Sequence, residues 1–270
     1  MTAMRVGVFG AGGRMGRQVC QAVADHPELE LVAAVDPALA GIDLRQGIGV
    51  DAPGVLVGAG PDDLVRAGVE VAVDFTVARA AVGNLAWCAD HGIHAVAGTT
   101  GIGPDAVDDL RRRFDGSQGN CLIAANFAIG AVLMQRFAEL AAPFMDGVEI
   151  IELHHDGKLD APSGTAVTTA ERLAAARTVG GLSWPPDHTE AAVVPGARGG
   201  AGPGGIRVHS VRLPGLVAHQ QVIFGAVGQT LTITHDAIDR SSFMPGVLLA
   251  IRSVPTLPGL TVGLDELLGF

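Results

Sequence analysis

The stretch VGVFGAGGRMGRQV (6–19) runs from a short apolar segment through a glycine-rich turn into an amphipathic segment. Gly10, Gly13 and Gly16 stand three residues apart, a pattern typical of a strand, a tight turn and a helix. Glycine lets the backbone turn sharply and approach a pyrophosphate, and the helix N-terminus offers unpaired N–H groups. The stretch therefore predicts a dinucleotide site; the alternative is a glycine-rich turn that holds no ligand.

Asp36 ends the next apolar segment, about 20 residues beyond the glycine turn, where a carboxylate accepts hydrogen bonds from ribose hydroxyls. A carboxylate there disfavours the 2′-phosphate of NADP by charge and by space. Pro37 follows, at a place where a protein that prefers NADP can carry arginine. The pair Asp36-Pro37 thus favours NADH over NADPH, although Arg14 could still reach a phosphate.

The first half of the chain alternates apolar runs with amphipathic segments. Runs that are apolar throughout are typical of strands buried on both faces, and the alternation predicts a parallel sheet covered by helices. The predicted strands are 5–10, 29–36, 69–76, 93–100 and 120–127, and the predicted helices include 16–26 and 78–92.

The pattern changes after Phe127. The sequence predicts helices at 130–145, 163–181 and 243–254, strands at 148–155 and 206–213, a hairpin at 219–235 and a loop rich in Pro and Gly at 184–205. Gly180 or Gly181 should end the second of these helices. We predict an α/β protein: an N-terminal Rossmann-like parallel-sheet domain plus a smaller α+β domain with a mixed sheet. Residues 1–126 and 238–270 form the dinucleotide-binding domain, and 127–237 the substrate-binding domain.

Composition narrows the possible functions. A net charge of −10 argues against a nucleic-acid partner. Hydrophobic residues make up 48% and charged residues 17%, more apolar than a monomer needs, which indicates a buried subunit interface. Residues 213–234 carry no Asp, Glu, Lys or Arg but hold Pro214 and several glycines, so we expect paired strands and no membrane span. Three scattered cysteines, and a first segment unlike a signal peptide, predict free thiols in a reducing cytoplasm.

The stretch ELHHDGKLDAPSGTA (152–166) gathers polar groups that a fold does not need for stability. Neighbouring residues on a strand point to opposite faces, so His154 and His155 should not serve one atom. Lys158 follows a turn, and Ser163 is a natural helix cap that leaves the N–H groups of Gly164 and Thr165 for an anion. Taken singly, such a histidine is more often a packed residue and such a lysine a surface charge. Together they predict a site for a small carboxylated substrate beside a proton donor.

Two further segments, AGTTG (97–101) and AANF (124–127), end predicted strands, where ligands bind in open α/β sheets. For Thr99 and Thr100 an ordinary helix cap is the alternative. We expect no metal site, because HExxH and CxxC patterns are absent from the sequence.

The chain resembles the 4-hydroxy-tetrahydrodipicolinate reductase (dihydrodipicolinate reductase) family. The resemblance rests on ELHHDGKLDAPSGTA and, in order along the chain, on VGVFGAGGRMG, VAVDFT, AGTTG, AANFAIG, LPGLVAHQQVIFG and LTITHDAIDRSSFMPGV. It implies a cytoplasmic enzyme of lysine and diaminopimelate biosynthesis. Such an enzyme transfers a hydride from NADH or NADPH to the dehydrated form of 4-hydroxy-tetrahydrodipicolinate, giving tetrahydrodipicolinate. It also implies a homotetramer assembled through the sheet of the second domain.

The resemblance assigns roles to residues by position. The proton donor falls on His154 and the catalytic lysine on Lys158. The substrate carboxylates fall to His155, Lys158, Gly164 and Thr165. The role of Arg240, a basic residue near the second crossing between domains, stays open. The cofactor contacts fall on Gly10, Ala11, Gly12, Gly13, Arg14, Met15, Asp36, Gly98, Thr99, Thr100, Ala124, Ala125, Asn126 and Phe127.

Two other functions remain possible from the residues alone. One is another two-domain NAD(P)-dependent dehydrogenase of a small amino or hydroxy acid, which has no need of the HHxxxK and DAPSGT pattern. The other is a non-catalytic NAD(P) sensor, which should lack an intact proton donor and carboxylate site.

Overall fold

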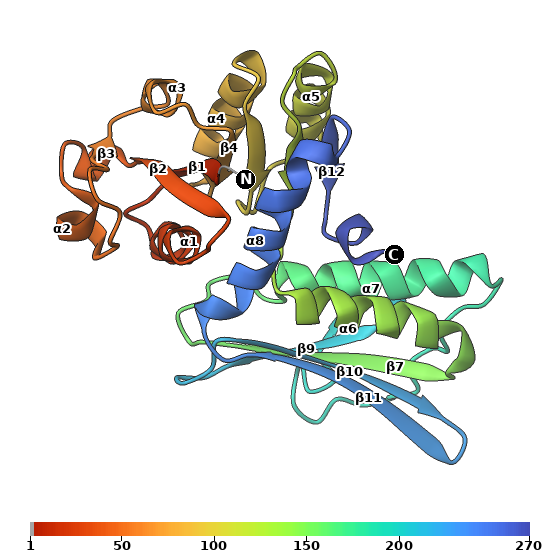
Figure 1. Cartoon of the computed structure of the whole chain (residues 1–270). Helices are drawn as coiled ribbons and strands as arrows, with labels where there is room; N and C mark the ends of the chain where they lie inside the picture. The colour runs from red at the N-terminus through yellow and green to blue at the C-terminus, as the bar shows by residue number, and fades with distance from the viewer. Residues whose placement is uncertain (1–2) are drawn as a thin grey trace. The chain divides into compact units, whose positions relative to one another are not determined.

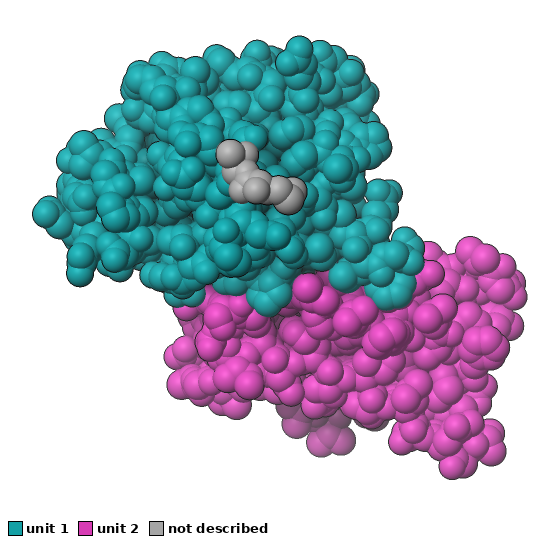
Figure 2. Space-filling model, viewed as in Figure 1, with its two compact units in different colours: residues 1–127, 243–270 teal, residues 128–242 magenta. Residues whose placement is uncertain are grey.

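The computed structural model describes residues 3–270, which divide into two compact units (Figure 2). The first unit runs as far as Phe127 and resumes at Phe243, and the second comprises Ala128–Ser242. The second boundary falls at Ser242, not after residue 237 as the sequence suggests. The sequence marks where a strand ends, but not where the contacts of the chain pass from one core to the other.

The sheet of the first unit has seven strands in the order β12-β6-β5-β4-β1-β2-β3, and its strand pairs are all parallel. This confirms the predicted Rossmann-like sheet. The strands are β1 (Met4–Phe9), β2 (Leu29–Val35), β3 (Val57–Gly58), β4 (Val71–Asp74), β5 (His94–Ala97), β6 (Cys121–Ile123) and β12 (Leu260–Val262). Sequence reasoning missed β3 and β12, because runs of two and three residues show no period.

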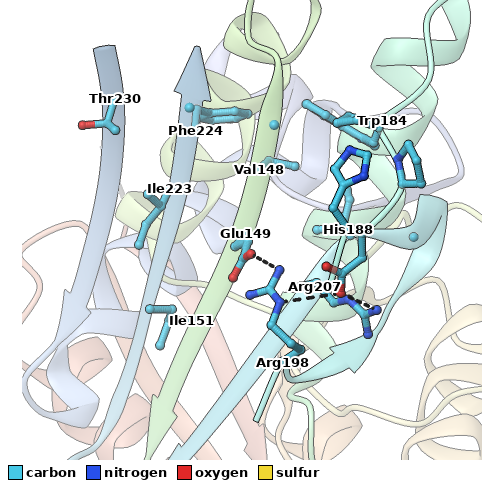
Figure 3. Close-up of a pocket in the computed structure, with 17 residues that line it drawn as sticks. Val148, Glu149, Ile151, Trp184, His188, Arg198, Arg207, Ile223, Phe224 and Thr230 are labelled. Atoms are coloured by element: carbon cyan, nitrogen blue, oxygen red, sulfur yellow. Dashed lines mark hydrogen bonds and ion pairs between the residues drawn. The ribbon is translucent and has the colours of Figure 1, made fainter. Parts of the chain in front are cut away.

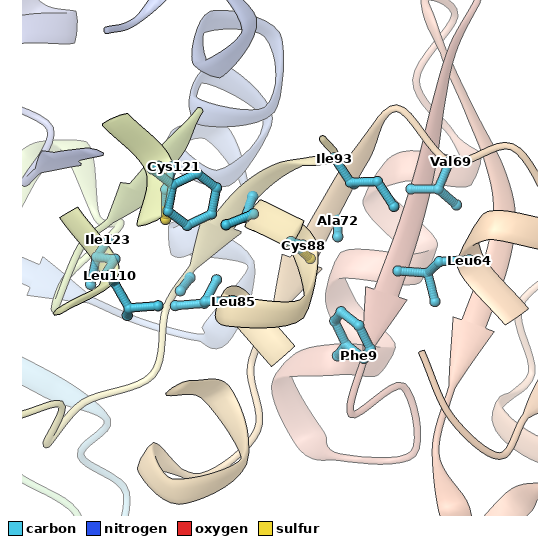
Figure 4. Packing of buried hydrophobic residues seen from close by; sticks show 14 of the residues in the cluster. Phe9, Leu64, Val69, Ala72, Leu85, Cys88, Ile93, Leu110, Cys121 and Ile123 are labelled. Carbon is cyan, nitrogen blue, oxygen red and sulfur yellow. The ribbon is translucent and has the colours of Figure 1, made fainter. Parts of the chain in front are cut away.

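Helices cover this sheet (Figure 1). They are α1 (Arg14–Ala24), α2 (Leu44–Ile48), α3 (Asp62–Arg66), α4 (Ala78–Asp90), α5 (Pro104–Asp115) and α8 (Met244–Ser253). Every residue of β4 is buried, as expected for a parallel strand covered on both faces. Figure 4 shows one side of the resulting core, where Phe9, Leu64, Leu85 and Leu110 lie among the buried side chains. Short 3₁₀ turns occur at Pro37–Leu39, Val254–Thr256 and Glu266–Leu268.

Strands β4, β5 and β6 are shorter than predicted, because their last apolar residues leave the sheet as loops. The N–H of Gly98 donates to the carbonyl of Asp74 (2.9 Å), and that of Ala124 donates to Ala97 (3.0 Å). These bonds continue the parallel ladder by one step and then release the chain. The predicted ligand segments 98–100 and 124–127 therefore lie at the carboxyl edge of the sheet.

The second unit contains a mixed sheet of five strands in the order β11-β10-β7-β9-β8, as predicted. Strand β7 pairs antiparallel with β10 and parallel with β9. The strands are β7 (Gly147–His154), β8 (Gly200–Ala201), β9 (Arg207–Arg212), β10 (Ala218–Ala226) and β11 (Gln229–Ala237), with 3₁₀ turns at Ala142–Phe144, Pro203–Gly205 and Arg240–Phe243. The predicted hairpin is β10–β11, closed by Val227 and by Gly228 at a φ of +75°.

Helices α6 (Ile129–Ala141) and α7 (Gly164–Val179) run side by side over one face of this sheet (Figure 1). They bury Ile150, Val222 and Phe224 against Met134 and Leu173. Helix α7 ends at Val179 with Gly180 as its cap, as predicted. The opposite face carries no helix of residues 3–270, and the consecutive residues Gln229–Thr232 of β11 are exposed. We call it the open face of the sheet.

The Pro- and Gly-rich segment 184–205 is tied to the open face by ion pairs. Arg198 donates to Glu149 on β7 (2.6 Å), and Asp187 pairs with Arg207 on β9 (2.7 Å). The hydrogen bonds from Thr189, more than the two arginines, lower the pKa of Asp187 to about 2. The segment also contains β8 and a 3₁₀ turn, so the expectation of a plain loop is wrong in that respect.

The three cysteines can be compared with the expectation from the sequence. Cys20, Cys88 and Cys121 are free and buried, as predicted, and burial raises the pKa of each thiol. Within these residues no helix is long and apolar enough to cross a membrane, and no cluster of His, Cys, Asp or Glu has a metal-binding arrangement.

Candidate active site

The glycine turn after β1 has the geometry that its sequence predicts. Gly10 adopts a φ of +71°, which favours glycine. A Cβ on Gly16 would lie only 2.0 Å from the carbonyl oxygen of Gly10, so glycine lets α1 pack directly on the turn. Gly13 is the N-cap of α1, and no side chain caps this helix. The backbone N–H groups at the start of α1 are therefore left for an anion, which fits a pyrophosphate.

Asp36, the residue directly after β2, holds the glycine turn in place. Its two carboxylate oxygens accept from the N–H of Gly12 (2.9 Å) and from the N–H of Ala38 (3.0 Å). Each oxygen can accept a second hydrogen bond, so the carboxylate can still accept hydrogen bonds from ribose hydroxyls. Arg17, which the sequence reasoning did not single out, donates to the carbonyl of Gly12 (3.0 Å) from the other side.

A buried carboxylate organises the middle of the same edge. Asp74 is 1% exposed and accepts from the backbone N–H and hydroxyl of Thr76 (2.9 and 2.7 Å), from Asn84 (2.7 Å) and from Thr99 (3.2 Å). It thereby ties the loop after β4 to the loop after β5. The alternative of a helix cap for Thr99 and Thr100 is wrong, because α5 begins at Pro104 with Gly103 as its N-cap.

The remaining predicted cofactor residues lie at this edge but differ in what they expose. Ala11, Ala124 and Phe127 are buried, so they could meet a ligand only through their backbone. The Phe127 ring packs against Phe75 at 5.7 Å between centroids. The more accessible members of the set are Gly13, Arg14, Thr100 and Ala125. The fourteen residues thus lie along one edge of one sheet.

His154, in the second unit, is the last residue of β7 and lies on the same strand face as Glu152. Its Nδ1 lies 2.5 Å from Oε2 of Glu152, a side chain with 0% exposure. Arg212 on β9, which is paired with His154 in the strand register, donates to both oxygens of Glu152 (2.8 and 2.9 Å). Burial lowers the pKa of His154, and the cations Lys158 and Arg212 add to this, while Glu152 opposes it.

Lys158 is the only lysine in the chain; the other cationic side chains are arginines and histidines. Its Nζ bonds both oxygens of Asp160 (2.8 and 2.9 Å), and the side chain of Asp160 is 61% exposed. Such an exposed pair contributes about 0–1 kcal/mol, so another carboxylate can replace Asp160 at little cost. His155 follows β7 directly, and its carbonyl accepts from the N–H of Lys158 (3.1 Å).

Ser163 caps α7, as predicted, with its hydroxyl accepting from the N–H of Ala166 (3.2 Å). Gly164, the first residue of α7, is exposed. The buried side-chain amide of Gln135 also fixes the first turn of α7. It donates to the carbonyl of Thr165 (3.3 Å) and to the hydroxyl of Thr169 (3.0 Å). The helix terminus is therefore fixed in place beside the loop that carries Lys158.

The structure brings His154, His155, Lys158, Gly164 and Thr165 into one stretch of the second unit, between the end of β7 and the start of α7. Arg240 begins a 3₁₀ turn after β11, and the structure gives it no role. Sequence reasoning missed Glu152, Arg212, Arg17 and Asp74. Glu152 could have been found, since a residue two before His154 shares its strand face. Arg212 could not, because only strand pairing places it there.

A cavity of about 460 Å³ lies elsewhere in the second unit (Figure 3). It is lined by Trp184, His188, Arg198 and Arg207 beside Glu149 and Ile223. Arg198 pairs with Glu149, as Figure 3 shows, and Arg207 pairs with Asp187. The cavity adjoins the Gly147 end of β7, roughly 23 Å along the strand from His154. The predicted site residues do not line it, and the chemistry of His154 and Lys158 belongs to the other end of the strand.

Known proteins resemble this chain over almost its whole length. Models of the family described as "Dihydrodipicolinate reductase, N-terminus" and "Dihydrodipicolinate reductase, C-terminus" match residues 4–127 and 130–268. The 4-hydroxy-tetrahydrodipicolinate reductases of Cutibacterium acnes and Thermobifida fusca are each 50% identical, over 98% of this chain and 99% of the relative. A dipicolinate-bound dihydrodipicolinate reductase from Paenisporosarcina sp. superposes with a TM-score of 0.85 at 38% identity, over 98% of this chain and 99% of the other.

More distant structures share the fold alone. An amine dehydrogenase from Mycobacterium smegmatis superposes with a TM-score of 0.63 but is only 17% identical, over 96% of this chain and 94% of the other. The family models and the close relatives favour neither another two-domain NAD(P)-dependent dehydrogenase of a small amino or hydroxy acid nor a non-catalytic NAD(P) sensor. The resemblance found in the sequence is confirmed: the chain belongs to the dihydrodipicolinate reductase family.

Proposed function

We propose that this chain reduces the dehydrated form of 4-hydroxy-tetrahydrodipicolinate to tetrahydrodipicolinate, with His154 as proton donor and Lys158 as carboxylate ligand. As a member of its family it is an NAD(P)H-dependent oxidoreductase of the reduction step in lysine and diaminopimelate biosynthesis. The observation that carries the residue roles is the grouping of a histidine, the only lysine and a capped helix N-terminus within residues 154–166.

The substrate is a small dicarboxylate, and each predicted residue offers it a distinct contact. Lys158 exchanges Asp160 for a substrate carboxylate. Carboxylate oxygens accept hydrogen bonds from the backbone N–H groups of Gly164 and Thr165 and from the ring of His155. The presence of dipicolinate, itself a ring dicarboxylate, in the Paenisporosarcina relative supports this substrate class.

The cofactor is held by the first unit. Residues 10–15 hold the pyrophosphate through backbone N–H groups, Asp36 holds the ribose, and segments 98–100 and 124–127 complete the site. Bound NAD(P)H supplies the hydride. Asp36 and Pro37 favour NADH, because the 2′-phosphate of NADPH would meet a carboxylate already held in place by Gly12 and Ala38.

Chemistry in the second unit completes the reduction. A hydride added to the ring leaves an electron pair on the conjugated system, and this pair must take up a proton. The imidazolium of His154 gives that proton. Burial lowers the pKa of His154, and the bound carboxylates of the substrate favour its charged form. The ammonium of Lys158 holds the substrate and stabilises the negative charge that builds up.

Assembly and location follow from the same reading. We infer a cytoplasmic homotetramer built through the open face of the second sheet. The exposed strand β11 supports this, as do the partly buried Ile151 and Ile223, which lie on the uncovered side. The three buried free thiols support a reducing compartment.

Steady-state kinetics with synthase-generated substrate test these roles. His154→Ala should lower kcat by roughly 10²–10⁴-fold with a modest change in KM. Lys158→Ala should lower kcat and raise KM for the dicarboxylate. NADH binding, followed by fluorescence, should stay near normal in both. His209→Ala is the matched control, because His209 also bonds a β7 glutamate, Glu149 (2.7 Å), but lies on the open face. A near-normal kcat in His154→Ala would place the donor elsewhere.

The single lysine allows a second test, independent of turnover. Reductive methylation with ¹³C-formaldehyde keeps the charge of the amine and labels Lys158 as the only side-chain amine. Its NMR signal should shift when dipicolinate is added and return when dipicolinate is removed. An unmoved signal under saturating dipicolinate would show that Lys158 does not bind the carboxylate.

A further inference from the structure

Glu152 lies at the base of the proposed donor. It is fully buried, which ordinarily favours the neutral acid, yet it is surrounded by hydrogen-bond donors. Arg212 donates to both oxygens, and the N–H of Ser163 donates to Oε1 (3.2 Å). Burial raises the pKa of Glu152, but the hydrogen bonds of Arg212, Ser210 and His154 outweigh it and lower the pKa below the ordinary value. The carboxylate is therefore ionised at neutral pH.

An ionised carboxylate can only accept hydrogen bonds. Because Oε2 of Glu152 lies 2.5 Å from Nδ1 of His154, Nδ1 must carry a proton. In the neutral ring the other nitrogen, Nε2, is then the unprotonated one, and in the imidazolium Nε2 carries the exchangeable second proton. The side chain of His154 remains 16% exposed, so a proton on Nε2 has a way out of the protein.

We propose that Glu152 is a positioning residue for the reduction. It fixes the tautomer and orientation of His154, so that Nε2 delivers the proton, and Arg212 holds Glu152 in place. In the step itself the Nε2–H bond breaks and a new bond to hydrogen forms at the substrate atom that holds the electron pair. The ring is left neutral, and its Nδ1–H still donates a hydrogen bond to Glu152. Water then returns a proton to Nε2. This inference rests on the proposed role of His154 as donor.

The same ion pair also anchors the loop that carries Lys158. Arg212 donates to the carbonyl of Asp160 (2.7 Å), and Glu152 accepts from Ser163, which caps α7. A purely structural role for the pair is therefore the competing explanation. That role predicts a looser loop and a higher KM, but it predicts neither a change of tautomer nor a shifted pH profile.

The decisive variant is Glu152→Gln, which keeps the size of the side chain and removes its charge. We expect kcat to fall by at least about tenfold, and by no more than the roughly 10²–10⁴-fold that the donor contributes. Burial and the charges of Lys158 and Arg212 lower the pKa of His154, whereas Glu152 raises it. The pH above which kcat/KM declines should therefore move to a lower value. Glu152→Asp, which keeps the charge, should restore most of that pH profile.

A direct readout is the tautomer of His154. Long-range ¹H–¹⁵N correlation spectra should show the Nδ1–H form in the wild type and a mixture, or the Nε2–H form, in Glu152→Gln. The matched control is Glu149→Gln. Glu149 lies on the same strand and also holds an arginine (Arg198, 2.6 Å) and a histidine (His209, 2.7 Å), but on the open face. It should leave kcat and the pH profile unchanged, provided that light scattering shows the same assembly as the wild type.

Comparison with His154→Ala separates the possible failures. If Glu152 acts through His154, adding Glu152→Gln to His154→Ala should cause no further loss of kcat. A further loss, or an unchanged tautomer and pH profile in Glu152→Gln, would overturn the positioning role. A normal kcat in His154→Ala would instead overturn the proposed donor, and the spectra would still show whether Glu152 fixes the ring. Should Glu152→Gln fail to fold, the double variant Glu152→Gln/Arg212→Gln leaves no unpaired buried charge and gives the same tautomer test.

Discussion

Gly16→Ala should destabilise the protein, although alanine is the better helix former. The new Cβ would lie 2.0 Å from the carbonyl oxygen of Gly10 and 2.7 Å from its carbonyl carbon, whereas Cβ atoms stay at least 3.0 Å from other atoms. Helix α1 and the turn must therefore separate by about 1 Å. The obstacle is backbone, so the cost belongs near the top of the usual range for overpacking, about 3 kcal/mol. Helix propensity returns about 1 kcal/mol, which leaves a net loss of about 2 kcal/mol.

Gly83→Ala provides the matched control. Gly83 lies inside α4, is exposed, and would place its Cβ with no atom within 4 Å. The same change of residue type should therefore stabilise the protein by about 1 kcal/mol. The two substitutions are expected to shift stability in opposite directions, because only one of the two glycines is packed against backbone.

Thermal unfolding at one fixed protein concentration measures both effects. At roughly 2–4 °C per kcal/mol, Gly16→Ala should lower Tm by about 4–8 °C, and Gly83→Ala should raise it by about 2–4 °C. NADH titration adds a second measurement, because a displaced turn loses hydrogen bonds to the pyrophosphate. One such bond to a charged group is worth about 1.5–3 kcal/mol, or roughly 10–100-fold in Kd. Unchanged Tm and NADH affinity in Gly16→Ala would refute the close-packing argument.

Three other outcomes are expected. Asp36→Ala should weaken NADH binding more than NADPH binding, because the ribose loses an acceptor while the 2′-phosphate loses a repulsive charge; equal losses in parallel titrations would remove the role of Asp36. Burial lowers the pKa of His154, and the donor must be protonated, so kcat/KM should fall as pH rises through that lowered pKa. The fall in kcat should come at higher pH, because bound carboxylates stabilise the imidazolium; rates that rise with pH from about 5 to about 9 would contradict an acid role. Light scattering at working concentration should give a tetramer, and a monomer would disprove assembly through the open face.

The sequence alone determined the class of fold, the glycine turn after β1 and the cap of α7. Apolar runs alternating with helical patterns indicated the parallel sheet, because strands buried on both faces need side chains that are apolar throughout. The glycine spacing indicated the turn after β1, and the φ of Gly10 and the packing of Gly16 show the reasons. Ser163 was identified as a helix cap from its residue type and place. These features depend on neighbours in the chain, so they can be read from it.

Only the tertiary structure revealed the groups that hold the site in position. The residue type of Thr99 fits a helix cap, but its hydroxyl donates a hydrogen bond to Asp74 instead. The pairing of Lys158 with Asp160 could not be predicted from the sequence either. Arg212 reaches Glu152 because β9 runs parallel to β7 in one register, a pairing between residues far apart in the chain. Such contacts follow from strand order and register, which depend on how the whole sheet buries its apolar face. A local pattern of residues carries no record of that choice.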